Sequence, residues 1–163
     1  MKGPRVRLEP LAAEHHERLR ELRREPEVVR WWQEPSDDFL GEEKGVHKYA
    51  VLLAGEVIGF AQWYAESDPM YRHAGVDLFL GEAFQGQGLG TEVVRVLCAH
   101  LIDDLGFHRL VIDPEVENEV AIASYRKVGF RPVGVMRRYQ RDRFGEWKDG
   151  LLMDLLAEEF VRE

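Results

Sequence analysis

A glycine-rich segment between residues 85 and 91 has the composition of a phosphate-binding loop. It reads Gln85-Gly86-Gln87-Gly88-Leu89-Gly90-Thr91 and follows an apolar run that we expect to be a strand. Glycines let backbone N–H groups turn toward an anion with no Cβ in the way, and a helix that starts near Gly90 would add its positive N-terminal dipole. The spacing matches neither the dinucleotide pattern Gly-x-Gly-x-x-Gly nor a nucleotide loop that ends in Gly-Lys-Ser/Thr. Taken alone, the segment is also compatible with a flexible glycine loop in front of a helix.

A second segment follows at a spacing that completes a known pattern. Asn118, Ala121, Tyr125-x-Lys127 and Gly129-Phe130 come after the pair Asp113-Pro114. Together with the element Gln-x-x-Gly-x-Gly at residues 85–90, these residues resemble the GNAT superfamily of acetyl-CoA-dependent N-acyltransferases. The resemblance covers about residues 5–156 of the chain.

Membership of this superfamily implies an α/β (α+β) fold in a single acetyltransferase domain over residues 1–163. Its central twisted sheet is mixed and mostly antiparallel, has about six or seven strands, is splayed in the middle and is flanked by about four helices. Acetyl-CoA would lie in the splay, with its pyrophosphate on the amides of residues 86–91 and its pantetheine along residues 78–80. The resemblance thus implies these acetyl-CoA-binding residues: Leu78, Phe79, Leu80, Gln85, Gly86, Gln87, Gly88, Leu89, Gly90, Thr91 and Asn118.

A narrower resemblance concerns the acceptor. Trp31-Trp32, Gly59-Phe60-Ala61-Gln62-x-Tyr64, Val76-Asp77-x-Phe79-Leu80-Gly81 and Ile112-Asp113-Pro114 are similar to the aminoglycoside 6′-N-acetyltransferases. Siderophore-pathway N-acyltransferases share much of this outline. The implied reaction is direct transfer of acetyl from acetyl-CoA to a primary amine of an aminoglycoside in a ternary complex, which confers antibiotic resistance. The alternatives are an N-acyltransferase for a lysine side chain, a siderophore precursor or a protein N-terminus, and a non-catalytic acyl-CoA-binding regulatory module.

That resemblance implies that two aspartates bind the amine or accept its proton. An alkyl amine has a pKa near 10, so it arrives protonated and must lose a proton before it attacks a thioester. Asp77 is the candidate base or ammonium anchor, and Asp113 would hold a second amine of a polycationic substrate. The structural alternatives are an exposed polar strand residue for Asp77 and a strand-ending Asp-Pro turn for Asp113.

Other side chains complete the predicted site. The resemblance implies that the Tyr125 hydroxyl faces the CoA sulfur, where it would protonate the departing thiolate; the structural alternative is a packed aromatic residue. The backbone N–H groups at Leu78 and Phe79 would polarise the thioester carbonyl. Trp31 and Trp32 point to different faces of a helix, so we expect one to be in the core and one to face the substrate. Gln62 and Tyr64 share a strand face with Phe60 and are further substrate-binding candidates.

The elements that must position these residues follow from hydrophobic periodicity and from breakers. The clearest helix carries Val93, Val94, Leu97, Cys98 and Leu101 on one face. The short helix at 27–32 should be closed by Pro35, and Asn118 should cap the helix that precedes Gly129. We expect helices over 11–24, 27–32, 91–104 and 118–127, and strands over 6–8, 49–53, 57–64, 74–80, 109–112, about 130–139 and 147–155.

Composition limits the partners. Lys and Arg total 22 against 30 Asp and Glu, which gives a net charge of −8. No basic patch for nucleic acid is evident, and an acidic surface favours cationic ligands, although it can also serve solubility alone. The single cysteine, Cys98, allows no intramolecular disulfide, the six histidines lack metal-ligand spacing, and no stretch is apolar enough to span a membrane. We therefore expect a cytoplasmic protein without a metal, a monomer or homodimer that binds a small cationic amine.

Overall fold

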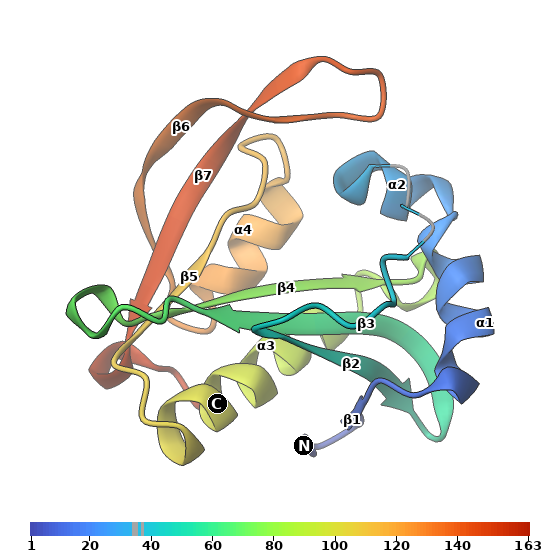
Figure 1. Ribbon diagram of the computed structural model, residues 1–163, viewed down its shortest axis with the longest axis horizontal. Coiled ribbons are helices and arrows are strands. Elements are labelled where there is room, and N and C mark those ends of the chain that lie inside the picture. Colours follow the sequence, from blue (N-terminus) through green and yellow to red (C-terminus); the bar gives the residue numbers. More distant parts are fainter. Residues whose placement is uncertain (34–35, 37) are drawn as a thin grey trace.

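The structure is a computed structural model that describes residues 1–33, 36 and 38–163. These residues form one seven-stranded sheet in the order β1-β2-β3-β4-β5-β7-β6, together with four α-helices (Figure 1). The strands are β1 (Val6–Pro10), β2 (Val46–Leu53), β3 (Glu56–Ala65), β4 (Ala74–Leu80), β5 (Arg109–Ile112), β6 (Arg131–Arg141) and β7 (Trp147–Leu156). The helices are α1 (Ala13–Arg23), α2 (Pro26–Trp32), α3 (Leu89–Ala99) and α4 (Glu119–Arg126).

The sheet opens between its two central strands. β4 and β5 are parallel and pair only at Ala74–Leu110 and Gly75–Val111, whereas every other neighbouring pair is antiparallel. Beyond these two residues, β5 leaves the edge of β4, while it is paired with β7 over its whole length (Figure 1). The prediction of a mixed, mostly antiparallel, splayed sheet with about four helices is confirmed.

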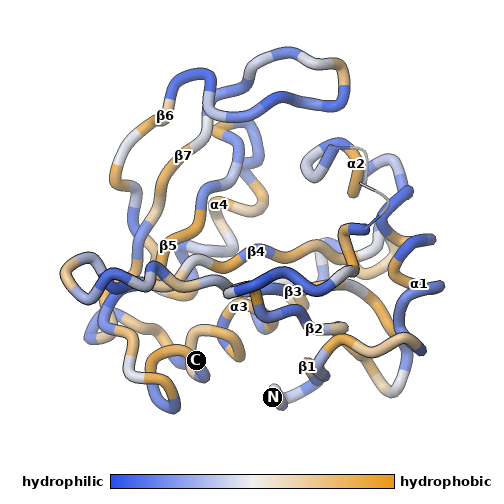
Figure 2. The backbone as a smooth tube through the Cα atoms, in the orientation of Figure 1, coloured by the Kyte–Doolittle hydropathy of each residue, from blue (hydrophilic) through white to orange (hydrophobic). Residues whose placement is uncertain are grey.

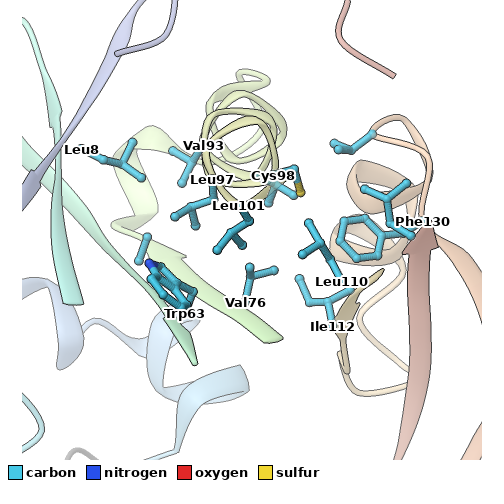
Figure 3. Packing of buried hydrophobic residues seen from close by; sticks show 14 of the residues in the cluster. Leu8, Trp63, Val76, Val93, Leu97, Cys98, Leu101, Leu110, Ile112 and Phe130 are labelled. Carbon is cyan, nitrogen blue, oxygen red and sulfur yellow. The ribbon is translucent and has the colours of Figure 1, made fainter. Parts of the chain in front are cut away.

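A hydrophobic core fills each face of the sheet. The larger core lies around α3, where Val93, Leu97 and Leu101 meet side chains from β1, β3, β4 and β5 (Figure 3). The smaller core lies under α1 and α2 and contains Phe60 and Phe79. Because alternate residues of a strand face opposite sides, β4 contributes to both cores. Figure 2 shows hydrophobic residues along β4 and β5, whereas the outer part of the β6–β7 hairpin is largely hydrophilic.

Most predicted elements lie within a few residues of the observed ones, and one helix differs in type. The segment predicted as a single helix over 91–104 starts earlier, at Leu89, and turns into a π-helix over His100–Asp104. There the Leu105 N–H donates to the His100 carbonyl, a five-residue step that the hydrophobic period does not reveal. Pro35, predicted to close the second helix, lies outside the described residues, and α2 ends at Trp32.

Candidate active site

The splay exposes one edge of the β4 backbone. In a strand, the N–H and C=O of one residue point to the same side. The Gly81 N–H donates to a β3 carbonyl. Because the direction of these groups alternates along a strand, the backbone N–H and C=O groups of Leu78 and Leu80 point away from β3. Accordingly, the Leu78 carbonyl accepts from Trp32 Nε1 at 3.0 Å and the Leu80 carbonyl accepts from Gln85 Nε2 at 2.9 Å. Of the two amides expected to polarise a thioester, the Leu78 N–H is therefore the one directed into the splay.

The glycine loop leads directly into α3. Gly88 is the N-cap residue of that helix and has a φ of +76°, and Gly86 has a φ of +72°. These left-handed conformations suit glycine. A Cβ built on Gly86 would meet nothing within 4 Å, so the space beside the loop is open. The amides at the positive end of the α3 dipole thus form a cradle that fits an anionic phosphate.

Arg5 and Glu92 form an ion pair next to this cradle, which was not predicted from the sequence. The Glu92 carboxylate accepts from the Arg5 and Val6 N–H groups and from Arg5 Nε. Arg5 Nη1 also donates to the Gln87 carbonyl at 3.2 Å. These hydrogen bonds and the Arg5 charge hold the pKa of Glu92 below its usual range although burial raises it. No sequence signal marks the pair, because 87 residues separate its members.

Besides Gln85, whose side-chain amide donates to the Leu80 carbonyl, two further side chains of the predicted phosphate loop make contacts within the protein. Gln87 Nε2 donates to the Ala83 carbonyl at 2.8 Å, and Leu89 is buried in the core beside α3. At these two positions only the backbone amides remain candidates for the ligand. Gln85, Gly86, Gly88, Gly90 and Thr91 line the cavity described next.

A cavity of about 890 Å³ connects the glycine loop, the splay and the space between α2 and β6. Its described lining includes two cationic side chains, Arg30 and Lys127, and three times as many acidic ones. Because opposite charge attracts a ligand into a cleft, this cavity suits a cation beside the splay. The acidic lining residues are Glu27, Asp77, Asp113, Glu115, Glu117 and Glu119.

Asp77 lies on β4 with its side chain in the cavity. Its Oδ2 accepts from Gln62 Nε2 at 3.0 Å, since the two residues are paired across β3 and β4. Burial raises the pKa of Asp77 to about 6, the Gln62 hydrogen bond lowers it in part, and the charge of Asp113 raises it further. A carboxylate with this pKa is ionised at neutral pH and is suited to accept a proton there.

Asp113 follows β5 and faces the same cavity. Its Oδ2 accepts from the hydroxyl of Tyr139, and Glu115 Oε1 accepts from Gln140 Nε2 at 3.1 Å. Burial raises the pKa of Asp113, and the Tyr139 hydrogen bond opposes that rise. Neither Tyr139 nor Gln140 of β6 was predicted from the sequence as a site residue. The acidic run after β5 is a sequence signal that marks Glu115, but no signal marks Tyr139.

Tyr125 approaches the splay from α4. Asn118 caps this helix as predicted, with its Oδ1 accepting from the Ala121 N–H at 3.2 Å. The Tyr125 ring lines the cavity and meets the Phe130 ring edge-on, with 6.2 Å between the ring centroids. Burial raises the pKa of Tyr125, and the charges of Asp77 and Asp113 raise it further. The phenol is therefore neutral near pH 7 and holds a proton to donate.

The remaining acceptor candidates lie at different depths. Trp31 and Trp32 both line the cavity, but Trp32 packs edge-on against Phe79 at 5.1 Å while the Arg30 guanidinium covers Trp31 at 4.6 Å. Trp32 is thus the one that belongs partly to the core. Tyr64 lies beside the cavity: its ring covers Gly75, and burial together with the charges of Asp77 and Asp113 raises its pKa to about 12.

Among the residues that the structure describes, no group of three or more His, Cys, Asp or Glu side chains is arranged to hold a metal ion. None of the helices described is long and apolar enough to cross a membrane.

Comparison with known proteins places this geometry in a family. Residues 5–131 match the family described as acetyltransferase (GNAT) domain. The aminoglycoside N(6′)-acetyltransferase type 1 of Klebsiella pneumoniae is 33% identical over 133 residues, a match that covers 67% of this chain and 65%, just under two thirds, of that enzyme. The spermidine N(1)-acetyltransferase of Escherichia coli K12 is 25% identical over 97% of this chain and 89% of its own length.

Solved structures show the same fold. A Vibrio cholerae spermidine N-acetyltransferase in complex with CoA and spermine superposes with a TM-score of 0.82 at 19% identity, covering 95% of this chain and 97% of that one. The aminoglycoside acetyltransferase AAC(6′)-Ib in complex with coenzyme A and kanamycin has a TM-score of 0.78 at 26% identity, over 94% and 96% of the two chains. The splayed sheet, the glycine cradle and the match over most of its length make this chain a member of the GNAT acetyltransferase family.

Proposed function

We propose that the protein transfers the acetyl group of acetyl-CoA to a primary amine of a polycationic acceptor, an aminoglycoside at its 6′-amine. The observation that carries this proposal is the acidic cavity that reaches the splay, which Asp77 and Asp113 both line and in which the charge of Asp113 raises the pKa of Asp77. A ligand with several ammonium groups gains from each such carboxylate. The 33% identity to an aminoglycoside N(6′)-acetyltransferase supports the choice of acceptor.

The donor binds at the opposite end of the cavity. The residues that would hold the pyrophosphate are the amides of the loop at 86–91, at the N-terminus of α3. The Leu78 N–H, which points into the splay, would donate to the thioester carbonyl and stabilise the charge that develops on its oxygen. In this arrangement acetyl-CoA supplies the activated acetyl group, and the chain supplies the contacts that fix its position.

Proton transfers complete the reaction. The amine nitrogen loses its proton toward Asp77 and attacks the carbonyl carbon, so that a C–N bond forms as the C–S bond breaks. Tyr125 gives its proton to the departing sulfur, which leaves as the free thiol of CoA. The attacking nitrogen then loses its second proton, which restores the Tyr125 phenol, so that the products are the amide, the thiol and the one proton taken up by Asp77. Gln62 holds one oxygen of Asp77 through its 3.0 Å hydrogen bond and leaves the other oxygen for the amine.

A polyamine acceptor is the second candidate. The chain matches a spermidine N(1)-acetyltransferase over 97% of its own length, at 25% identity. A linear polyamine carries several ammonium groups as an aminoglycoside does, so the acidic cavity suits both.

We also infer a cytoplasmic location, since Cys98 is a buried free thiol that requires no oxidising compartment.

The test is release of free thiol from acetyl-CoA across a panel of acceptors. The panel holds an aminoglycoside with a 6′-amine, its counterpart with a 6′-hydroxyl, spermidine, a lysine derivative and a peptide with a free N-terminus. We expect the highest kcat/KM for the 6′-amino compound and no transfer to the 6′-hydroxyl compound. A preference for spermidine would select the second candidate. A preference for the lysine derivative or the peptide, or acetyl-CoA binding without transfer to any amine, would contradict the proposal.

A further inference from the structure

Strand β6 departs from regular pairing next to the acidic cavity. Met136 pairs with Gly150 of β7, and the next pair is Gln140 with Lys148. Three residues of β6 therefore oppose the single residue Asp149. Arg138, in the middle of the three, has a φ of +50°, and its N–H donates to Asp149 Oδ1 at 2.8 Å. Such an irregularity redirects the side chains that follow it.

The redirected side chains meet the acids that follow β5. The Tyr139 hydroxyl donates to Asp113 Oδ2, and the neighbouring Gln140 amide donates to Glu115 Oε1. β7 leaves room for this arrangement, since a Cβ on Gly150 would lie 2.8 Å from Tyr139 Cδ1. Tyr139 is 45% exposed as a residue, so it lies at the surface rather than in the core.

The hydrogen bond fixes one oxygen of Asp113 and opposes neutralisation of the carboxylate. Burial and the nearby Asp77 carboxylate both disfavour a second negative charge in this place. Tyr64 and Tyr125, the other titratable side chains that sense Asp113, have raised pKa values and stay neutral. The Asp113 hydrogen bond also raises the pKa of Tyr139, so this phenol keeps its proton and remains a donor. Tyr139 thereby stabilises the charged form of Asp113, which is the form that binds an ammonium group.

We propose that Tyr139 is a positioning residue that holds the Asp113 carboxylate toward the acceptor and so sets the preference for amines with a second ammonium group. This inference rests on the proposed function, because it assigns the second ammonium to Asp113. Tyr139 needs no contact with the reacting amine, which lies at Asp77.

The experiment compares two acceptors that share a reacting amine. Kanamycin carries a 6′-amine and further ammonium groups, whereas 6-amino-6-deoxyglucose carries the single amine. The readout is the ratio of kcat/KM for kanamycin to that for the monoamine. In Tyr139→Phe we expect the ratio to fall about ten-fold, mainly through the KM of kanamycin, because a hydrogen bond to a charged group is lost. Tyr71→Phe, at an exposed tyrosine in the loop before β4, should keep the wild-type ratio.

A double-mutant cycle separates positioning from a direct contact. In an Asp113→Asn background, adding Tyr139→Phe should lower the ratio no further, because the carboxylate through which Tyr139 acts is gone. An unchanged ratio in Tyr139→Phe, or an equal ten-fold loss in both backgrounds, would overturn the inference.

Binding measured without turnover keeps the inference distinct from the proposed function. Calorimetric titration of kanamycin into the CoA-bound protein should show the same pattern of losses. If the wild type binds kanamycin in this pattern but acetylates no amine, the proposed function fails and the role of Tyr139 stands. If kanamycin is acetylated and Tyr139→Phe binds it like the wild type, the role of Tyr139 fails alone. A wild type that does not bind kanamycin overturns both.

Discussion

The donor and acceptor ends of the cavity are built in different ways. The donor end consists of backbone: the amides of one continuous loop, the N-terminus of α3 and the open edge of β4. The acceptor end consists of side chains from α2, β3, β4, β6 and the segment after β5. In the proposed function, the backbone cradle would recognise the phosphates of acetyl-CoA whatever the acceptor is, whereas separate side chains can change with the acceptor without disturbing the loop.

The two ends also differ in how their charges are held. At the acceptor end, burial raises the pKa of Asp77 and of Asp113, which means that their negative charges are poorly compensated and would be stabilised by a bound cation. At the donor end, the Glu92 carboxylate near the cradle is already matched by Arg5 and two backbone N–H groups. It therefore serves as a brace and presents little uncompensated charge to a phosphate. Variants at one end should leave the other end intact.

The largest expected effect is at Asp77. Asp77→Asn should lower kcat by about 10²-fold or more, within the usual contribution of a general base, and leave acetyl-CoA binding unchanged. Because the pKa of Asp77 is about 6, wild-type activity should be present above pH 6 and should fall as the carboxyl group is protonated below it. Steady-state kinetics between pH 5 and 8 check both points.

The matched control for this change is Asp104→Asn, at an exposed aspartate on the far end of the α3 segment. It should show wild-type kcat and the wild-type pH profile. An Asp77→Asn protein with full turnover would show that Asp77 is not the general base. The proposed chemical role of the acceptor end would then be wrong.

Tyr125 is expected to have the next largest effect. Tyr125→Phe keeps the ring against Phe130 but removes the proton donor, so turnover should fall about 10–10²-fold while the melting temperature stays near that of the wild type. Single-turnover measurements with saturating acceptor would isolate the chemical step. Wild-type rates in this variant would mean that Tyr125 contributes packing only.

A smaller effect is expected at the cradle. Gly88→Ala forces a Cβ onto a residue with a φ of +76°, which costs about 1–2 kcal/mol of unfolding free energy if the conformation is kept. If the loop relaxes instead, the amides move and the Kd of acetyl-CoA rises, by about ten-fold or more. Gly106→Ala provides equal backbone strain away from the cavity, at a φ of +68° with nothing near its Cβ. It should be destabilised and still bind acetyl-CoA like the wild type, and a similar loss of affinity in both variants would show that strain alone weakens binding.

The smallest effect is expected at Trp32, where the two ends meet. Trp32→Phe removes the 3.0 Å hydrogen bond to the Leu78 carbonyl, worth about 1 kcal/mol, and keeps most of the ring contact with Phe79. We expect a loss of a few-fold in kcat/KM, shared between donor and acceptor. Trp147→Phe, at an exposed tryptophan that begins β7, should have no effect. A loss confined to one substrate would assign Trp32 to that end alone.

Much of the fold and of the donor end followed from local sequence. The bounds of β4 and β5 agree with the predicted strands because each is an apolar run with a clear end, at Gly81 and at Asp113-Pro114. The cradle could be predicted because its glycines stand at every second position from 86 to 90 and its helix is strongly periodic. Asp77 and Asp113 were found through family resemblance, since their meeting depends on two strands that pair over only two residues.

The rest depends on contacts that no local pattern encodes. Tyr139 reaches Asp113 only because three residues of β6 oppose one of β7, which breaks the alternation from which a strand face is predicted. Arg5 reaches the loop from the first strand through the fold of the whole chain. The sequence did not decide which of Trp31 and Trp32 packs in the core, because two adjacent helical residues of the same type differ only in the neighbours that the tertiary structure gives them.

The independence of the two ends can be measured directly with two ligands and two variants. Acetyl-CoA and kanamycin are each titrated calorimetrically into wild type, Gly88→Ala and Asp113→Asn, with CoA present in the kanamycin titrations at a concentration that saturates each variant. We predict that Gly88→Ala weakens acetyl-CoA and leaves kanamycin within about two-fold of wild type, and that Asp113→Asn does the reverse. Equal weakening of both ligands in both variants would contradict a backbone-built donor end and a side-chain-built acceptor end.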